Sequence, residues 1–313
     1  MKILVLNQLS SRHMDQLLRV DPASEIVSCT LKEAEQHIAD TDILVAWGST
    51  HIENLFAKAK QLKWIHALSA GVENLNIAPL IDQHIILTNS KGIHGIPVSE
   101  HVFALLLSFT RGLHLCAKNQ QAKVWKRVYT DELYEKTLAI IGLGSIGREV
   151  AKKAKAFGMN VVATKREVTA EIFIDRLYNP AELDDMLAIS DVVVVALPLT
   201  PETHNYIQRQ HFTAMKKTAY FINIARGDVV VEADLIAALQ AEEIQGAGLD
   251  VFMNEPLPKT SPLWEMPNVI ITPHSAAMSP YYMDRAMKLF ADNLSRFIEK
   301  TDMHNVIDKY KGY

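Results

Sequence analysis

The chain has 313 residues, of which 49% are hydrophobic and 22% are charged. This length exceeds what one hydrophobic core usually supports, so two domains are expected, and the composition excludes a disordered or collagen-like chain. A formal net charge of -4 offers no attraction to nucleic acid or anionic lipid, so neither is expected as a partner.

The two cysteines and the N-terminus give no sign of a metal site or of export. Cys29 and Cys116 lack the spacing of a zinc site or a disulfide framework, and the apolar run at residues 3–6 is too short for a signal peptide. No apolar run approaches the ~18 residues of a transmembrane helix. We therefore expect a soluble, cytoplasmic protein with no metal and no membrane span.

The first third of the chain alternates short β-branched runs with amphipathic segments. This alternation is typical of a parallel sheet with crossover helices. The predicted strands cover residues 3–6, 25–29, 42–47, 64–68 and 85–88.

A long helix is predicted next, because Pro97 suits a first helical turn and an apolar pattern continues toward Ala117. A second series follows, with strands at 137–141, 160–163, 191–196, 220–224, 246–251 and 269–272, and a final helix at 281–299. We expect the fold class α/β, with two doubly wound domains of Rossmann or flavodoxin type and a cleft between them. The expected boundaries are 1–96 with 279–313 for the first domain, and 97–278 for the dinucleotide-binding domain.

A glycine-rich turn at residues 142–147 lies between the predicted strand 138–141 and a helical pattern at 148–157. In this context Gly142 permits a tight turn, Gly144 lets the backbone approach a pyrophosphate, and Gly147 lets the helix pack close to the strand. The helix N-terminus offers amides and a positive dipole end to the phosphates. The residues expected at the phosphates are Gly142, Gly144, Ser145, Ile146 and Gly147.

The end of the next strand bears on which dinucleotide binds. About 20 residues after the first glycine, NAD-specific domains carry an acid that binds the ribose 2′-hydroxyl. Here the chain reads Thr164-Lys165-Arg166, and two cations attract a 2′-phosphate. We favour NADP(H) over NAD(H) as the cofactor; the alternative is that both cations are solvated loop residues.

Three polar residues follow predicted strands of the second series, where open α/β sheets bind ligands. Arg226 can hold a substrate carboxylate with its planar fork, and His274 can donate a proton to a carbonyl oxygen as hydride arrives. Glu255 can orient that imidazole and favour its protonated form. Each has an ordinary structural alternative, but together with the glycine-rich turn they predict a dehydrogenase of small 2-keto or 2-hydroxy acids.

The order of these segments resembles the D-2-hydroxyacid dehydrogenase family, which includes glyoxylate/hydroxypyruvate reductases, D-lactate dehydrogenases and phosphoglycerate dehydrogenases. The resemblance covers nearly the whole chain. It rests on residues 69–74, 98–101, 142–147, 197–201, 223–227, 248–252 with Glu255-Pro256, and 272–274.

The resemblance implies Arg226 as the substrate-binding arginine and Glu255 with His274 as the acid/base pair. It also implies a contact of Asp250 with the nicotinamide carboxamide, a first domain that binds substrate, and a homodimer. Further implied contacts are cofactor binding at Thr164, Lys165, Arg166, Leu197, Pro198 and Ala225, and substrate carboxylate binding at Ala70, Gly71 and Val72.

Lys165 departs from the family pattern, because it aligns with the common ribose-binding aspartate and resembles the NADP-preferring branch. His94 and the Ser275-Ala276-Ala277 segment also depart from it and leave the substrate open. We expect the working direction to be reduction of a 2-keto acid.

Two alternatives remain open at this point. One is a dinucleotide-sensing interaction protein on the same fold. The other is different chemistry on this scaffold, such as formate oxidation. Formate needs no bulky side-chain pocket, so large residues in the cleft would argue against it, unless these residues are core or dimer contacts. These residues are Trp47, Met278, Tyr281 and Tyr282.

Overall fold

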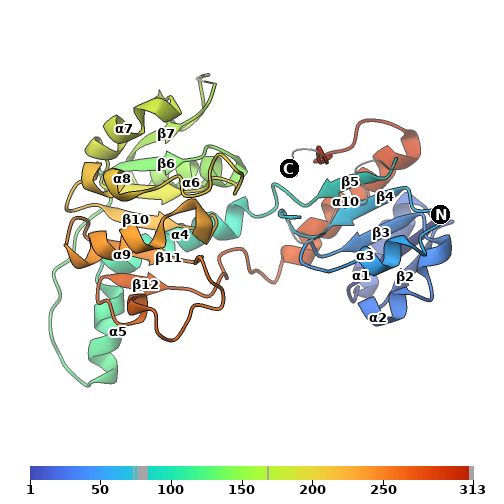
Figure 1. Cartoon of the computed structure of the whole chain (residues 1–313), viewed down its shortest axis with the longest axis horizontal. Helices are drawn as coiled ribbons and strands as arrows, with labels where there is room; N and C mark the ends of the chain where they lie inside the picture. The colour runs from blue at the N-terminus through green and yellow to red at the C-terminus, as the bar shows by residue number, and fades with distance from the viewer. Residues whose placement is uncertain (73–74, 76–83, 168, 310–313) are drawn as a thin grey trace. The chain divides into compact units, whose positions relative to one another are not determined.

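A computed structural model of the chain describes residues 1–72, 75, 84–167 and 169–309. The chain folds into two compact units, the first formed by Met1–Ile93 with Ser279–Tyr313 and the second by His94–Met278. Each unit contains its own parallel β-sheet with helices (Figure 1). The predicted fold class of two parallel-sheet α/β domains is confirmed. Within the described part of the chain, no helix has the length and apolar character needed to cross a membrane.

The sheet of the first unit has five strands in the order β2-β1-β3-β4-β5, all paired in parallel. This is the strand order of a doubly wound, flavodoxin-like sheet. The strands are β1 (Lys2–Val5), β2 (Glu25–Ser28), β3 (Ile43–Ala46), β4 (Trp64–Ala67) and β5 (Ile86–Asn89).

Alternate residues of these strands point to opposite faces of the sheet, and helices bury both faces. One face packs against α1 (Ser11–Val20) and the C-terminal helix α10 (Tyr282–Glu299), with Trp64 against Phe290 at the centre. The other face is covered by short helices. These are α2 (Leu31–Ala34), the 3₁₀ turn η1 (Ile38–Asp40) and α3 (Glu53–Phe56).

The sheet of the second unit has seven parallel strands in the order β12-β11-β10-β9-β6-β7-β8. The direction of winding reverses between β6 and β9, which is the position where doubly wound sheets bind dinucleotides. The strands are β6 (Thr137–Ile141), β7 (Asn160–Thr164), β8 (Arg176–Tyr178), β9 (Val192–Val195), β10 (Tyr220–Asn223), β11 (Gly246–Leu249) and β12 (Val269–Ile271).

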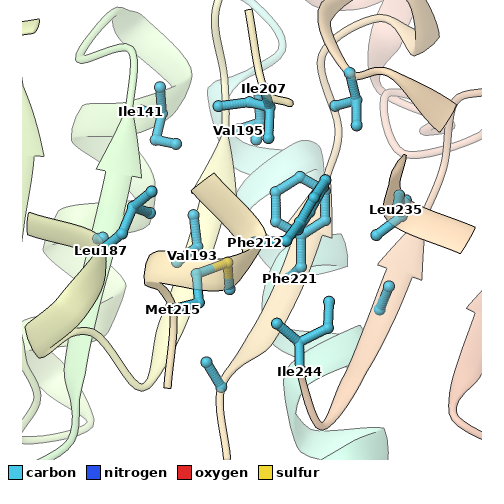
Figure 2. Close-up of a cluster of buried hydrophobic side chains, with 14 of the residues drawn as sticks. Ile141, Leu187, Val193, Val195, Ile207, Phe212, Met215, Phe221, Leu235 and Ile244 are labelled. Atoms are coloured by element: carbon cyan, nitrogen blue, oxygen red, sulfur yellow. The ribbon is translucent and has the colours of Figure 1, made fainter. Parts of the chain in front are cut away.

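Two hydrophobic layers bury the second sheet. Ile141, Val193 and Phe221 face one layer, where α7 (Leu183–Ile189), α8 (Arg209–Ala214) and α9 (Glu232–Gln240) contribute Leu187, Phe212 and Leu235 (Figure 2). The intervening strand residues face α4 (Gly95–Thr110) and α6 (Ser145–Ala156). The strand β9 consists of four buried valines, as expected for a central parallel strand that is covered on both faces.

The prediction of one long helix from Pro97 toward Ala117 was wrong. The structure has two helices, α4 (Gly95–Thr110) and α5 (Leu113–Gln121), separated at Gly112, which has a φ of 63°. A Cβ at Gly112 would lie 2.6 Å from a methyl group of Val128, so the close approach of this loop also requires glycine. The three-residue edge strand β8 was not predicted.

Candidate active site

Arg226, Glu255 and His274 follow three neighbouring strands of the second sheet. Arg226 lies beyond β10, Glu255 beyond β11 and His274 beyond β12, and these strands are adjacent and parallel. Since the carboxyl ends of parallel strands meet at one edge, all three residues are carried by loops at the same edge of the sheet.

Glu255 and His274 are directly paired. The Nδ1 atom of His274 lies 2.7 Å from Oε2 of Glu255, and the other carboxylate oxygen of Glu255 accepts a hydrogen bond from the backbone amide of Phe252 at 3.0 Å. A carboxylate only accepts, so Nδ1 carries a proton and Nε2 is the nitrogen left to face a substrate. The His274 side chain is 49% exposed, which leaves its ring accessible.

The turn that carries His274 is held by a buried carboxylate. Asp250 is 2% exposed, and its two side-chain oxygens accept hydrogen bonds from the amides of Ser275 and Ala276, both at 2.9 Å. Its backbone carbonyl accepts the amide of His274 at 2.8 Å. Asp250 therefore orders the turn that carries His274. The family resemblance implied only a contact of Asp250 with the nicotinamide and did not predict this structural function.

His101 extends this network and was missed as a functional residue at the level of sequence. Its Nε2 lies 2.9 Å from the hydroxyl of Thr272, and that hydroxyl donates to Asp250 at 2.6 Å. His101 lies on α4, 171 positions from Thr272 in sequence. Its place in the segment 98–101 was the available signal, but no chemistry was assigned to it.

Arg226 begins a short 3₁₀ turn, η4 (Gly227–Val229), and its Nη1 donates to the carbonyl of Ala225 at 2.8 Å. A Cβ on Gly227 would lie 1.9 Å from the carbonyl carbon of Phe252, so glycine lets the loop after β10 touch the loop that leads to Glu255. Burial, followed by the positive charge of Arg226, lowers the pKa of His94 to about 4. The arginine therefore has a neutral imidazole near it.

The glycine-rich turn has the geometry that its sequence predicts. Gly142 has a φ of 101°, and Gly147 packs so closely that a Cβ would lie 2.7 Å from the carbonyl oxygen of Gly142. In contrast, a Cβ on Gly144 would meet nothing within 4 Å. Gly144 caps α6, whose first residues are Ser145 and Ile146, so open space lies in front of the amides at this helix N-terminus. This cradle fits a dinucleotide pyrophosphate.

Beyond β7, one of the two predicted cations, Lys165, has an acidic neighbour. The hydroxyl of Thr164 accepts the amide of Gly142 at 3.3 Å, and Nζ of Lys165 contacts Oε1 of Glu171 at 2.8 Å. Arg148 binds the same carboxylate with two nitrogens. Hydrogen bonds from Arg148 and then Lys165 lower the pKa of Glu171 to about 2. Sequence reasoning missed Glu171; an acid six residues after Lys165 was the available signal.

The remaining cofactor candidates lie beyond β9 and β10. The carbonyl of Pro198 accepts a hydrogen bond from the hydroxyl of Thr203. Leu197 is partly buried and packs against the hydrophobic core. The amide of Ala225 donates to the side chain of Asn223 at 3.1 Å. β9 is the neighbour of β6 and β10 is the next strand, so these loops lie on the same edge of the sheet as the glycine-rich turn.

The substrate-binding candidates Ala70, Gly71 and Val72 lie in the first unit, after β4. The carbonyls of Ala70 and Gly71 accept hydrogen bonds from Asn89 and Ser69, and Val72 is buried. Two residues of this motif, Glu73 and Asn74, lie outside the described residues.

The large residues considered as cleft candidates differ in burial. The rings of Trp47 and Tyr282 pack 5.3 Å apart in the first unit, and burial raises the pKa of Tyr282 to about 12. Met278 and Tyr281 are exposed. Among residues 1–72, 75, 84–167 and 169–309, no cluster of histidine, cysteine, aspartate and glutamate is arranged to hold a metal ion.

Comparison with known proteins places this chain in a family. The model for the NAD binding domain of D-isomer specific 2-hydroxyacid dehydrogenases matches residues 103–276. Over 254 residues the chain is 35% identical to glyoxylate/hydroxypyruvate reductase B of Citrobacter koseri, and 78% of each chain is covered. The chain belongs to the D-isomer-specific 2-hydroxyacid dehydrogenase family. This membership confirms the predicted resemblance to that family.

Solved structures of this family share the fold over the whole chain. A D-isomer specific 2-hydroxyacid dehydrogenase family protein of Aeromonas salmonicida has a TM-score of 0.87 and 36% identity, with 98% of this chain and 99% of that chain covered. The NADPH-dependent glyoxylate/hydroxypyruvate reductase of Sinorhizobium meliloti, solved with NADP and sulfate, has a TM-score of 0.83 and 29% identity, with 100% and 99% covered. The chain spans 50–59% of the length of the D-3-phosphoglycerate dehydrogenases that it matches.

Proposed function

We propose that this dehydrogenase reduces a small 2-keto acid to the corresponding D-2-hydroxy acid. The observation that carries the proposal is the pairing of Glu255 with His274, with Nδ1 and Oε2 2.7 Å apart, on loops beside the one that carries Arg226. The relatives are named as dehydrogenases and reductases, which does not favour the alternative of a dinucleotide-sensing interaction protein.

Each residue of the proposed site has one task. The guanidinium of Arg226 holds the substrate carboxylate with two parallel hydrogen bonds, which also fixes the adjacent carbonyl. The protonated His274 donates the proton on Nε2 to the carbonyl oxygen as the C=O π bond breaks, and it is left neutral. Glu255 accepts a hydrogen bond from the Nδ1–H group of His274. This bond holds the imidazole ring in place and stabilises the positive charge of the ring before proton transfer.

The bound dinucleotide supplies the hydride that adds to the carbonyl carbon. The open space before Gly144 and the amides that begin α6 accommodate its pyrophosphate. Lys165 and Arg166 favour the 2′-phosphate of NADP(H), and the solved relative from Sinorhizobium meliloti contains NADP. We therefore propose NADPH as the preferred reductant and assign this binding to the second unit.

We assign substrate binding to the first unit, with amides around Ala70, Gly71 and Val72 receiving the substrate carboxylate. A glycine-bearing turn can present backbone amides to an anion. Replacing Gly71 by valine is expected to raise KM for the keto acid while leaving the Kd for NADPH unchanged, because a branched side chain restricts this turn.

We also propose a cytoplasmic homodimer. The segment after α5 exposes two aromatic side chains completely, Trp125 and Tyr129, together with Val124, and Leu113 at the start of α5 is exposed as well. Aromatic residues are enriched in protein interfaces, so this arm is suited to a second copy of the chain. Serine at both aromatic positions is expected to change the sedimenting mass from a dimer to the single chain of 35.1 kDa. Free Cys29 and Cys116 fit a reducing compartment.

A substrate panel tests the proposed activity. Absorbance at 340 nm is followed with NADPH and NADH against glyoxylate, hydroxypyruvate, its phosphorylated form and larger aliphatic and aromatic 2-keto acids, and formate is tested with the oxidised dinucleotides. Turnover of at least one keto acid, with the hydroxy acid formed in equal amount to the dinucleotide consumed, supports the proposal. Tight dinucleotide binding without turnover of any keto acid overturns it.

A further inference from the structure

Glu171 lies between two cations, Arg148 just after the glycine-rich turn and Lys165 just after β7. Its Oε1 is 2.6 Å from Nη2 of Arg148 and 2.8 Å from Nζ of Lys165, and its Oε2 is 2.9 Å from Nε of Arg148. The Glu171 side chain is only 12% exposed, whereas Arg148 is 48% exposed. The carboxylate is therefore held in one place by a bidentate arginine contact and a shared lysine contact.

The position of this carboxylate matters because of the elements that surround it. Arg148 directly follows the last glycine of the fingerprint on α6, and Lys165 directly follows β7, the strand beside β6 (Figure 1). The end of this strand is where a domain of this type meets the adenosine ribose. The sequence has a lysine where NAD-specific domains have an acid, but the fold brings an acid to that lysine from six residues further along.

The charges at this place act on the two dinucleotides in opposite directions. Lys165 has three N–H groups, and contacts with Thr169 and Glu171 use two of them. A 2′-phosphate must share Lys165 and Arg148 with the carboxylate and is repelled by its negative charge. A ribose 2′-hydroxyl, in contrast, has a proton to donate, and a carboxylate is its best acceptor.

We propose that Glu171 is a specificity-determining residue that limits the preference for NADP(H) and supports binding of NAD(H). Its carboxylate competes with the 2′-phosphate for Lys165 and Arg148, and it accepts the 2′-hydroxyl in place of the acid that the strand end lacks. This inference rests on the proposed function for the identity of the cofactor, and it makes the enzyme one that uses both dinucleotides.

The test is the charge-neutral, equal-sized variant Glu171→Gln. We expect kcat/KM to rise with NADPH and to fall with NADH, so that the ratio of the two increases about tenfold. The control is Glu265→Gln, which makes the same change of charge at an exposed glutamate just before β12, the edge strand on the far side of the sheet from β7. This control is expected to leave both values unchanged.

Binding of two dinucleotide fragments separates this inference from the proposed reaction. Calorimetric titration with 2′,5′-ADP and with 5′-AMP needs no keto acid and no turnover. Glu171→Gln is expected to bind 2′,5′-ADP about tenfold more tightly and 5′-AMP more weakly, whereas Lys165→Gln loses affinity for 2′,5′-ADP. If no keto acid is turned over but these shifts occur, the proposed function fails and the role of Glu171 stands.

Two results would overturn the inference. An unchanged ratio in Glu171→Gln, equal to that of the Glu265→Gln control, means that the carboxylate does not meet the ribose. A loss of affinity for 2′,5′-ADP means that Glu171 only orients Lys165. Should Glu171→Gln fail to fold, wild-type protein is titrated with both fragments. Cations that are free of competition are expected to bind 2′,5′-ADP at least ~100-fold more tightly than 5′-AMP, through several charge-assisted contacts. A preference of that size in wild type overturns the inference, and a smaller one supports it.

Discussion

Replacing Gly144 and Gly147 one at a time by alanine separates the two functions of the glycine-rich turn. Gly144 has a φ of -88° and a ψ of -160°, which alanine adopts without strain, and its Cβ would meet nothing within 4 Å. Since alanine loses less backbone entropy on folding, Gly144→Ala should stabilise the protein by about 0.4–1 kcal/mol. The added methyl group lies in the cradle, however, so we expect the Kd for NADPH to increase at least tenfold, about 1.4 kcal/mol.

Gly147→Ala should instead lower the folding stability of the protein. A Cβ at Gly147 would lie 2.7 Å from the carbonyl oxygen of Gly142 and 3.1 Å from a methyl group of Ile140. Both neighbours are fixed by the strand, so α6 must move away from it at a cost of about 1–3 kcal/mol, typical of overpacking. The main loss here is therefore of folding stability.

Urea unfolding and calorimetric titration with NADPH measure both effects in each variant. Gly144→Ala is expected to unfold at the same or a higher urea concentration than wild type and to bind NADPH poorly. Gly147→Ala is expected to unfold at a lower urea concentration than wild type. The reasoning fails if Gly144→Ala binds NADPH as tightly as wild type, because the open space would then not be the pyrophosphate cradle.

Three further outcomes are expected. His274→Asn should lower kcat by ~10²-fold or more while the Kd for NADPH stays within twofold, because asparagine cannot donate the proton; near-normal turnover would refute the assignment. Arg226→Lys should raise KM for the keto acid and lower kcat together, because a point charge cannot replace a planar fork, and an unchanged KM counts against a substrate contact. Burial lowers the pKa of His66 to about 3, so the unfolded chain binds a proton that the folded chain excludes. The stability from this group is complete above pH ~6.5 and is lost as the pH falls toward 3, by about 2 kcal/mol between pH 7 and 5, and His66→Gln should flatten that dependence in urea unfolding.

Much of the fold could be predicted because the periodic signals are strong. The buried valines of β9 and the run before Gly142 form continuous apolar stretches that a parallel sheet requires. The break between α4 and α5 was missed because apolar residues continue through Leu113, while the decisive feature is a left-handed Gly112 held close to Val128, a contact distant in sequence. The edge strand β8 has three residues, too few to show an alternating pattern.

The site was predictable only where the chemistry lies in one short segment. Spacing identified the glycine-rich turn and the three loops at the strand ends, but it did not reveal that Glu171 binds Lys165 or that His101 binds Thr272. Both contacts depend on how loops and helices from different parts of the chain meet. A charged residue in a loop has the same appearance in sequence whether it is solvated or paired.

The placement of His274 depends on buried groups rather than on its exposed partner. Its backbone has a φ of 49°, in the left-handed region, which costs a residue other than glycine about 1 kcal/mol or more. Asp250 offsets this cost, because its carboxylate binds the next two amides and its carbonyl binds the amide of His274. The hydroxyl of Thr272 donates a hydrogen bond to the same Asp250 carboxylate and also contacts Nε2 of His101. The backbone and the ring of His274 are thus held separately, since the Asp250 network fixes the turn and Glu255 contacts Nδ1 of the imidazole.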